Sequence, residues 1–392
     1  MKIGIDKLAF YTPGYALDMT DLAEARGVDP AKFHQGLGQD VMAVAPQTQD
    51  AVTLALNAAE RVLDEADKKA IDLVILATES GVDQSKAGAI YLHHLLNIQP
   101  YTRSIEVKEA CYSGTFGLHA AVDHVKLHPD KKTLVVASDI ARYGLNTSGE
   151  VTQGAGAVAI LISADPKIAV VNDDSVALTR DIMDFWRPNY SEEAKVDGHY
   201  SNEQYLDQLA QTWAAYKERN HHTLDDFAAV IFHLPYTKMG VKGMRHLLAM
   251  ESVSEEKTKA LWETLEASRT YNRQIGNIYT GSLYLSLISL LSKANALKAA
   301  DTVGLYSYGS GAVSEFYSIT LVSGYHEQID QGMIEKMLSD RKKLTVSEYE
   351  ALFECDWPTD GRTVHYQPNR DETDFRLLGF MDHQRQYGKS SD

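Results

Sequence analysis

The chain has 392 residues, too many for one ordinary single-core domain and enough for two. Its formal net charge of −16 argues against nucleic acid or an anionic membrane as a partner, so an anionic ligand would need a local basic patch. Two cysteines cannot build a disulfide framework, and no CxxC pair indicates zinc. The chain shows neither a signal peptide nor an apolar run near the roughly 18–20 residues of a membrane span, and we expect a cytoplasmic protein.

The first half of the chain alternates strand-like and helix-like segments. A strand buried on both faces is predicted at 71–80, where "IDLVILATES" runs apolar and then turns polar. Residues 109–127, "EACYSGTFGLHAAVDHVKL", predict a polar junction that opens an amphipathic helix. Two further strands are predicted at 132–139 and 154–165, with a Gly-rich turn at the start of the second.

The same order returns in the second half. An apolar strand is predicted at 227–236, a polar junction and apolar helix at 276–294, and a strand, Gly-rich turn and strand at 301–324. This repetition predicts an α/β protein of two similar halves packed together, residues 1–167 and 168–392.

Two stretches interrupt the repeat. Residues 180–222 form an insertion rich in aromatic and polar residues, and 327–372 form a charged stretch that predicts a surface excursion with one helical piece near "SEYEALF". The later part of the first insertion predicts a helix with an apolar face composed of Tyr205, Leu206, Leu209, Trp213 and Tyr216.

Four polar residues occupy equivalent places in the two halves. Glu79 and His233 end buried strands, whereas Cys111 and Asn277 open helices. If the halves pack about a pseudo-two-fold axis, the four side chains converge on one pocket. A thiol at a helix start meets free N–H groups and the positive end of the helix dipole, which favour the thiolate.

The chemistry of this set is that of covalent catalysis. Cys111 is a candidate nucleophile, His233 a proton exchanger, and a desolvated Glu79 a general acid or base. Asn277 can orient the imidazole or a water molecule, and an oxyanion hole can form between the Cys111 N–H and the "YGSG" turn, 308–311. Each residue alone also fits a plain role: an inert core thiol, a core histidine, a solvated strand end, a helix cap. The pairing across the halves favours the catalytic interpretation.

A basic patch follows His233 in the chain. Lys238 and Lys242 are four residues apart on one predicted helix face, with Arg245 one turn further. The patch is either a solvated helix surface or a site for a phosphorylated ligand whose far end reaches the pocket.

Segments from nearly the whole chain carry a family resemblance. They are "GLGQD" (36–40), "ATESGVDQSK" (77–86), "EVKEACYSGTFGL" (106–118), "GAGAVA" (154–159), "MDFWRP" (183–188), "VDGHYSNEQYL" (196–206), "FHLPYTKMGVKG" (232–243), "GNIYTGSLY" (276–284) and "YGSG" (308–311). Together they resemble the bacterial form of hydroxymethylglutaryl-CoA synthase of the mevalonate pathway, in the thiolase-like superfamily. The resemblance implies a thiolase-like fold, with two βαβαβ-type halves in layered α/β/α/β/α packing.

The resemblance also implies a reaction, the condensation of acetyl-CoA with acetoacetyl-CoA to give hydroxymethylglutaryl-CoA and CoA. Cys111 would carry the acetyl group as a thioester, and Glu79 would take a proton from its methyl. The enolate, stabilised by the N–H groups of Cys111 and Ser310, would attack a ketone polarised by His233, with Asn277 positioning the second substrate. Water would then release the product.

Further residues and properties come from the resemblance alone. Around the acyl chains it implies Tyr143, Asn146, Thr152 and Ser201. Along CoA it implies Asp29, Lys32, Lys238 and Lys242. It implies acyl-CoA substrates, no metal, no bound cofactor and a homodimer.

Other functions stay open at this level. A β-branching synthase of polyketide assembly would share Cys, His and Glu but act on a carrier protein. A β-ketoacyl-carrier-protein synthase lacks an acid in the role of Glu79, and its His leads into an Asn-containing stretch unlike "HLPY". A thiolase needs a second active-site cysteine, whereas we expect Cys355 to be structural. A silent acyl-CoA binder and a cysteine hydrolase are the remaining alternatives.

Overall fold

The structure, a computed structural model, describes residues 1–367 and 373–390. Five strands come from the N-terminal half, and the predicted strands at 71–80, 132–139 and 154–165 are among them. They are β1 (Ile3–Tyr11), β4 (Ile71–Ala77), β5 (Arg103–Val107), β6 (Lys132–Ile140) and β7 (Ala155–Ala164). β4 lies parallel to β5 and β6, while β7 lies antiparallel to both β6 and β1.

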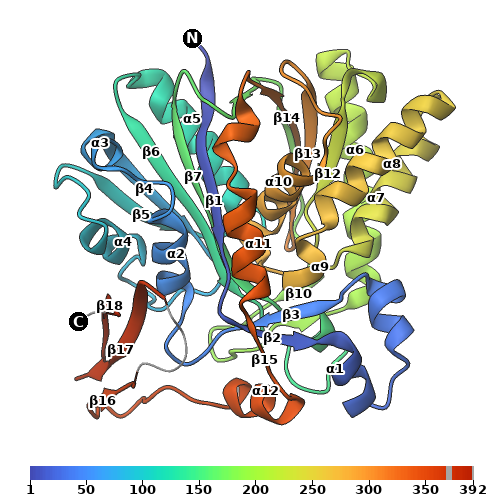
Figure 1. The fold of residues 1–392 in the computed structure, drawn as a ribbon. Helices are drawn as coiled ribbons and strands as arrows, with labels where there is room; N and C mark the ends of the chain where they lie inside the picture. Colours follow the sequence, from blue (N-terminus) through green and yellow to red (C-terminus); the bar gives the residue numbers. More distant parts are fainter. Residues whose placement is uncertain (368–372, 391–392) are drawn as a thin grey trace.

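The C-terminal half repeats this pairing. Its strands are β8 (Ala169–Val171), β9 (Val176–Thr179), β12 (Ala229–Phe232), β13 (Thr302–Gly309) and β14 (Val313–Leu321). β12 lies parallel to β13, and β13 antiparallel to β14, as β4, β6 and β7 do in the first half. β8 pairs with both β1 and β14, so that the described strands join into one ten-stranded sheet (Figure 1).

Helices form three layers around these strands. They are α2 (Ala51–Ala59), α4 (Ala89–Leu95), α5 (Ser113–Leu127), α6 (Gly198–Asn220), α7 (Lys238–Ala249), α8 (Glu255–Arg269) and α10 (Ser282–Lys293). α2 and α4 lie with the N-terminal strands and α6, α7 and α8 with the C-terminal ones, on opposite sides of the molecule in Figure 1. Residues of α5 and α10 share one core cluster with residues of both sets of strands.

The alternation of side chains along the strands fixes the order of the layers. On β4, Ile75 packs in the cluster that holds α5 and α10, whereas Val74 and Leu76 pack in the cluster that holds α2 and α4. On β12, Ile231 faces the central cluster and Val230 faces α6, α7 and α8. The predicted α/β/α/β/α packing of two similar halves is therefore confirmed.

The first insertion contains a small hairpin and a long helix. Strands β10 (Phe185–Trp186) and β11 (Lys195–Val196) pair, and α6 follows after Asp197, whose side chain accepts a hydrogen bond from the backbone of Tyr200. The predicted apolar face is correct, because Tyr205, Leu209, Trp213 and Tyr216 are buried and Leu206 packs against the same cluster.

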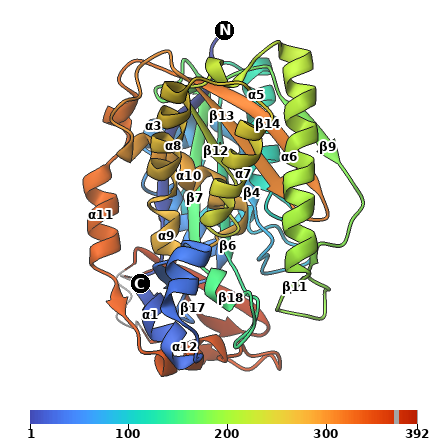
Figure 2. The same ribbon diagram turned by 90° about the vertical axis from the view of Figure 1, so that its right-hand side faces the viewer.

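The second excursion is more integrated than the sequence predicts. It holds two helices, α11 (Gln331–Ser339) and α12 (Val346–Phe353), and the short strand β15 (Lys342–Lys343). β15 joins β2 (Tyr15–Asp18) and β3 (Val41–Val44) in a second sheet, which lies with α12 and α1 (Met19–Ala25) at the end of the molecule opposite the N-terminus (Figures 1 and 2). The expectation of one helix was wrong, because it overlooked α11, whose Ile334 is buried and whose Met337 and Leu338 pack against the central cluster. The stretch 368–372 at its end lies outside the described residues.

The described chain ends in a hairpin that the sequence did not predict. β16 (Val364–His365), β17 (Phe375–Met381) and β18 (Gln384–Lys389) form a third sheet, and β17 packs against α2. No helix among the described residues is long and apolar enough to cross a membrane.

Candidate active site

The thiol and one carboxyl group of the predicted set meet directly. Glu79 lies two residues after β4, and Cys111 lies two residues before α5. The Cys111 Sγ donates a hydrogen bond to the Glu79 Oε1 at 3.3 Å. Burial of the carboxyl group, reinforced by the nearby Asp139, raises the pKa of Glu79 to about 8. A proton acceptor that titrates near neutral pH therefore touches the candidate nucleophile.

The expectation of a thiolate stabilised by the helix start is wrong for this structure. Burial and the neighbouring Glu79 raise the pKa of Cys111 well above its ordinary value. The thiol precedes the first helical residue, Ser113, by two positions, and desolvation next to a carboxylate outweighs the helix dipole. Ala110, with φ +39°, puts the chain in the left-handed region just before the thiol.

A buried carboxylate that the sequence analysis missed anchors the Glu79 segment. Asp139, in β6, accepts hydrogen bonds from the Glu79 backbone N–H at 2.9 Å and from the hydroxyls of Thr78 and Ser80. It also accepts from the hydroxyl and backbone N–H of Thr280 in the second half. Asp139 thus ties the strand end that bears Glu79 to the segment before α10. Its place at the polar end of a predicted strand was the available signal.

Asn277 lies on that segment and is buried. Its Oδ1 accepts hydrogen bonds from the Tyr279 N–H at 2.9 Å and the Ser282 hydroxyl at 2.8 Å. Its Nδ2 donates to the Tyr143 hydroxyl at 3.4 Å, and its backbone N–H donates to the Thr152 carbonyl at 2.9 Å. The residue therefore stabilises a local turn and does not cap α10, whose N-cap is Gly281, and it presents its amide to the predicted substrate residue Tyr143.

Aromatic rings enclose the thiol. Tyr143, Phe185 and Tyr279 pack edge to face with ring centroids 5.7–5.9 Å apart, and Cys111 packs against this group. Such an enclosure limits water around the thioester that Cys111 would carry.

His233 follows β12 and is buried as a neutral imidazole. Its backbone N–H donates to the Tyr306 carbonyl, and burial lowers the pKa of the ring to about 3. The Nδ1 has no hydrogen-bond partner among the described residues, and within them no hydrogen bond joins His233 to Glu79 or Cys111. Within the residues that the structure describes, direct contact of Glu79, Cys111, His233 and Asn277 is therefore not seen.

The C-terminal strands nevertheless reach the thiol. Gly309 ends β13, the neighbour of β12, and a Cβ at Gly309 would lie 2.6 Å from the backbone nitrogen of Tyr112, the residue after Cys111. Only glycine allows this approach. His233 thus ends the strand next to the one that touches the Cys111 loop.

A second buried carboxylate, Asp184, organises the "YGSG" turn and was also missed. Its Oδ1 accepts a hydrogen bond from the Gly311 N–H at 2.9 Å. Its Oδ2 accepts from the Tyr308 hydroxyl at 2.8 Å and from the hydroxyl of Ser201 at 3.1 Å. Asp184 belongs to the "MDFWRP" segment, and it connects the turn that contains Ser310 with the predicted substrate residue Ser201.

A cavity of about 920 Å³ opens beside this site. Residues of both halves line it, among them Glu79, Ala110, Phe185, Arg187 and Ser310. The positive charge of Arg187 opposes the rise in the pKa of Glu79. Cys355, which the sequence analysis takes as structural, is exposed and lines the same cavity. Within the described residues, no group of three or more His, Cys, Asp or Glu could hold a metal ion.

The remaining acyl-site candidates differ in their placement. The Thr152 hydroxyl donates to the Gly149 carbonyl in its own turn, while its carbonyl accepts from Asn277. Asn146 is exposed at φ +58°, and its backbone N–H donates to Glu150. The structure brings Thr152 to the site by its main chain and leaves the Asn146 side chain outside it.

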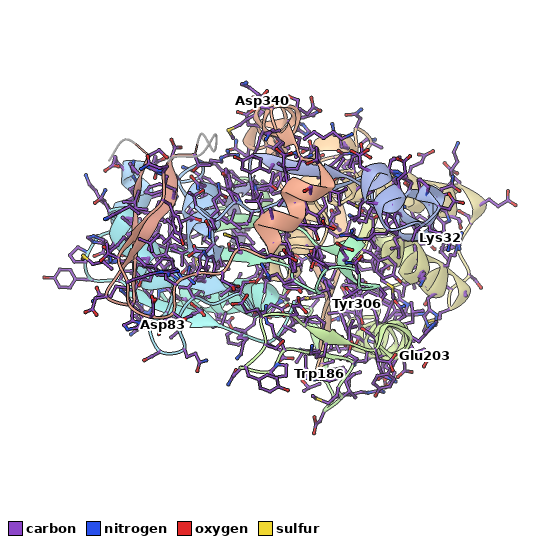
Figure 3. All side chains as sticks on the ribbon, turned by 90° about the horizontal axis from the view of Figure 1, so that it is seen from below. Lys32, Asp83, Trp186, Glu203, Tyr306 and Asp340 are labelled. Atoms are coloured by element: carbon purple, nitrogen blue, oxygen red, sulfur yellow. The ribbon has the colours of Figure 1, made fainter. Side chains whose placement is uncertain are left out.

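The two segments that hold the four predicted CoA residues lie side by side. Asp29 and Lys32 belong to the segment around η1 (Lys32–Leu37), and Lys238 and Lys242 start α7 as predicted. The Lys238 Nζ donates to the Gln35 carbonyl at 2.8 Å, which joins the two segments. In Figure 3, Lys32 lies on the same side of the molecule as Glu203 of α6.

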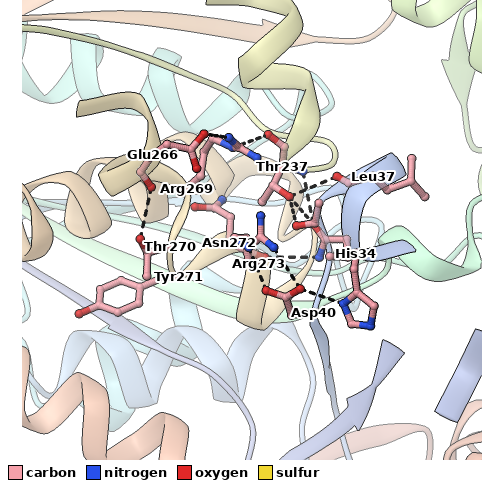
Figure 4. Close-up of polar contacts among 12 residues, drawn as sticks. His34, Leu37, Asp40, Thr237, Glu266, Arg269, Thr270, Tyr271, Asn272 and Arg273 are labelled. Atoms are coloured by element: carbon pink, nitrogen blue, oxygen red, sulfur yellow. Dashed lines mark hydrogen bonds and ion pairs between the residues drawn. The ribbon is translucent and has the colours of Figure 1, made fainter. Parts of the chain in front are cut away.

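Hydrogen bonds and ion pairs join the segment around η1 to residues near α7 and α9 (Asn272–Ile275) (Figure 4). The Asp40 carboxylate accepts hydrogen bonds from Arg273 at 2.9 and 3.1 Å and forms an ion pair with His34 at 2.9 Å. The Thr237 hydroxyl, one residue before α7, donates to the Leu37 carbonyl. These contacts fix the start of α7 against the segment that bears Lys32.

Comparisons with known proteins identify the family of this chain. The family models described as hydroxymethylglutaryl-coenzyme A synthase N terminal and C terminal match residues 1–167, and 173–271 with 258–376. A hydroxymethylglutaryl-CoA synthase of Enterococcus faecalis is 52% identical over 92% of this chain and 94% of its own. A polyketide biosynthesis 3-hydroxy-3-methylglutaryl-ACP synthase, PksG of Bacillus subtilis, is 35% identical over 90% of this chain and 88% of its own. A crystal structure of a hydroxymethylglutaryl-CoA synthase with CoA has a TM-score of 0.97 at 50% identity, covering 99% of this chain and 100% of the other.

Proposed function

The chain belongs to the hydroxymethylglutaryl-CoA synthase family, and we propose how its own residues condense acetyl-CoA with acetoacetyl-CoA and water to give hydroxymethylglutaryl-CoA and CoA. The family places this acyl-transferring enzyme in the mevalonate pathway to isoprenoids. The observation that carries the mechanism is the hydrogen bond from the Cys111 thiol to a Glu79 carboxyl whose pKa is about 8.

Acetylation of the thiol comes first. Because the pKa of Cys111 is raised, the thiol loses its proton to Glu79 as Sγ attacks the acetyl carbonyl of acetyl-CoA. This step uses the ionised form of Glu79, which is the minor form at neutral pH because the pKa is about 8. The proton then passes from Glu79 to the departing CoA sulfur, which leaves acetyl-Cys111 and an ionised Glu79. In this step the thioester of acetyl-CoA breaks, the thioester of Cys111 forms, and one proton moves from the Cys111 thiol through Glu79 to the CoA sulfur.

The carbon–carbon bond forms next. Ionised Glu79 takes a proton from the acetyl methyl, and the enolate oxygen accepts hydrogen bonds from the backbone N–H groups of Cys111 and Ser310. Asp184 supports this arrangement because it fixes the Gly311 N–H beside Ser310. The enolate carbon attacks the ketone of acetoacetyl-CoA, the neutral imidazole of His233 donates a hydrogen bond to the ketone oxygen, and Glu79 returns its proton to the resulting alkoxide.

Hydrolysis completes the cycle. Water attacks the thioester carbonyl, Glu79 takes a proton from that water, and the Cys111 sulfur leaves as a thiol once the proton is passed on. The acetyl-derived carbon becomes the free carboxylate of the product. The proposed route needs no metal and no bound cofactor.

The basic patch gives CoA its place in this scheme. In a chain of net charge −16, Lys32, Lys238 and Lys242 form a local positive surface suited to the phosphates of CoA, with Asp29 beside Lys32. Asn277, Tyr143, Thr152 and Ser201 would line the path of the acyl groups. This arrangement supports free CoA esters over carrier-bound ones.

We also propose a homodimer in the cytoplasm. β5 is an edge strand paired with β4 alone among the described strands, so one side of its backbone is free. Ile105 on this strand and Phe116 on α5 are half exposed. A second copy that pairs along β5 would cover these groups. Sedimentation of the wild type beside Ile105→Lys tests this, and an unchanged sedimentation coefficient would rule out the β5 interface.

The activity is tested by mass spectrometry of the products from acetyl-CoA with acetoacetyl-CoA. We expect equal amounts of hydroxymethylglutaryl-CoA and free CoA, and loss of both in Cys111→Ser. Free CoA without carbon–carbon bond formation would instead show a cysteine hydrolase. Condensation only with an acetylated carrier protein would show the activity named for the Bacillus subtilis relative.

A further inference from the structure

A chain of buried polar groups connects α12 with the aromatic enclosure of the thiol. Its members are Glu150, Gln153 and Tyr349, each at most 3% exposed. We propose that Gln153 and Tyr349 are positioning residues that set Tyr143 against Asn277, so that α12 of the second excursion is part of the site for the second substrate. This inference rests on the proposed function, because it assigns these residues to the condensation step.

The direction of every hydrogen bond in the chain is fixed. The Gln153 Oε1 accepts from the backbone N–H groups of Tyr143 at 2.7 Å and Gly144 at 3.3 Å, and backbone N–H groups can only donate. The Gln153 Nε2 must therefore be the group that donates to the Tyr349 hydroxyl at 2.8 Å. That hydroxyl in turn donates to the Glu150 Oε1 at 3.2 Å. Because each donor and acceptor in this series has one possible assignment, the hydrogen bonds favour a single arrangement of these side chains.

An ion pair anchors the far end of this chain. The Arg26 guanidinium bonds both oxygens of Glu150, from Nη2 at 2.7 Å and from Nε at 2.9 Å. The Arg26 Nη1 also pairs with Glu350 at 2.7 Å, on the same helix as Tyr349. Arg26 lies three residues before Asp29, so the chain begins beside the CoA segment and ends at the acyl site.

The loop between Tyr143 and Gln153 is folded onto Tyr143. A Cβ at Gly149 would lie 2.7 Å from the Cβ of Tyr143, so the loop crosses that residue without room for a side chain. Gly144 turns the backbone at φ +97°, a value that favours glycine. Tyr143 is thus enclosed by its own loop and held at its backbone by Gln153.

Two adjacent residues of this loop also hold Asn277. Thr152 accepts from the Asn277 N–H, and its neighbour Gln153 holds Tyr143, whose hydroxyl accepts from the Asn277 side chain. A shift of Gln153 therefore changes the distance between Tyr143 and Asn277. Asp139 holds the backbone of Glu79 through a hydrogen bond that involves neither Gln153 nor Tyr349, and Glu79 accepts the hydrogen bond from the thiol, so this contact should persist. The hydrogen bonds from Glu150 through Tyr349 to Gln153 should therefore affect the rate of condensation and leave the acetylation of Cys111 unchanged.

The test compares Tyr349→Phe with a matched control, Tyr325→Phe. Tyr325 is equally buried, and its hydroxyl donates to the Leu297 carbonyl at 3.1 Å, away from the site. Acetylation of Cys111 by acetyl-CoA, kcat and KM for acetoacetyl-CoA, and Tm are measured for both. We expect Tyr349→Phe to raise the KM for acetoacetyl-CoA about 5–10-fold with acetylation within about 2-fold of wild type, and Tyr325→Phe to lower Tm without changing that KM.

Gln153→Met extends the test into a double-mutant cycle. If both residues act through one chain, Tyr349→Phe adds less than about 2-fold to the KM of Gln153→Met. Multiplicative effects, equal losses in acetylation and condensation, or the same KM change in both Tyr→Phe variants would overturn the inference. Should Gln153→Met fail to fold, the paired tyrosine variants decide alone. A wild type that makes no hydroxymethylglutaryl-CoA would contradict the proposed function instead, which separates the two failures.

Discussion

The two halves of the molecule present the same frame with opposite chemistry. After β4 and before α5, the N-terminal half carries Glu79 and Cys111, an acid and a thiol joined by a hydrogen bond. At the equivalent places the C-terminal half carries His233 and Asn277, a neutral imidazole and an amide. The frame is repeated, but we propose that the N-terminal half transfers protons while the C-terminal half orients the substrate by hydrogen bonds.

The difference arises from what surrounds each group. The pKa of Glu79 rises to about 8 because its carboxyl is buried and lies near Asp139, whereas burial alone lowers the pKa of His233 to about 3. Glu79 therefore changes charge in the physiological range and His233 does not. The two halves share a backbone arrangement, but the residues around Glu79 and His233 determine which of the two side chains can exchange protons.

Replacement of the nucleophile should have the largest effect on this division. Cys111→Ser removes the thiol that receives the acetyl group, and we expect kcat to fall about 10⁴-fold, because a serine hydroxyl is a far weaker nucleophile beside the same acid. The rate of hydroxymethylglutaryl-CoA formation measures this. Asn277→Ala is the matched change in the other half, and a loss as severe there would contradict the assignment of covalent chemistry to the N-terminal half.

The imidazole should matter for one step only. His233→Ala removes the donor to the ketone oxygen, and we expect a loss of about 10²–10³-fold in condensation with acetylation of Cys111 retained. Because the pKa of His233 is about 3, no limb of the wild-type pH–rate profile between about pH 5 and 8 should belong to it. An imidazole limb that disappears in the variant would show that the ring titrates during the reaction.

The basic patch should affect binding and spare chemistry. We expect Lys242→Ala to raise the KM for acetyl-CoA about 10-fold, with kcat changed less than about 2-fold and the effect reduced in high salt. Arg245→Ala is the control, because Arg245 is an exposed member of the same basic patch that the family resemblance does not place along CoA. Equal effects of the two variants would mean that the positive charge acts at long range and not through a built site.

The smallest expected effect is on stability. Glu79 keeps its proton in the folded state up to about pH 8, whereas its ordinary pKa is 4.5, so unfolding releases a proton between these values and stability falls as pH rises through that window. Glu79→Gln should therefore have a higher Tm than wild type at about pH 9 and an equal one below pH 4.5. Glu203→Gln, at an exposed position of α6, is measured beside it as a control for the substitution itself. A difference in Tm that does not vary with pH would contradict the raised pKa.

Much of the fold follows from the sequence because it depends on local pattern. The apolar runs at 71–80 and 227–236 are strands, and the lysines at 238 and 242 share a helix as their spacing predicts. The partition between residues 1–167 and 168–392 stays a prediction. The second excursion was underestimated because its partners are distant in the chain: β15 pairs with β2, and the Tyr349 hydroxyl bonds Glu150, 199 residues away.

The missing part of the site has one physical cause. Asp139, Asp184 and Gln153 are buried polar groups whose partners come from distant segments, and no spacing along the chain reveals such partners. The expected thiolate was wrong for the same reason, since Glu79, 32 residues from Cys111, determines the state of the thiol. Local pattern locates the reactive residues, but their charge states depend on tertiary contacts.

The most direct test of the central claim follows the acyl group on the protein itself. Wild type, Cys111→Ser and Glu79→Ala are mixed briefly with acetyl-CoA, chased with acetoacetyl-CoA and analysed by mass spectrometry. We expect one acetyl group on Cys111 in wild type that the chase converts to hydroxymethylglutaryl-CoA, and none in Cys111→Ser. In Glu79→Ala we expect an acetyl group that forms more slowly, because the thiol has lost its proton acceptor, and that the chase leaves in place. Conversion of the acetyl group by Glu79→Ala at the wild-type rate, or labelling of Cys111→Ser, would contradict it.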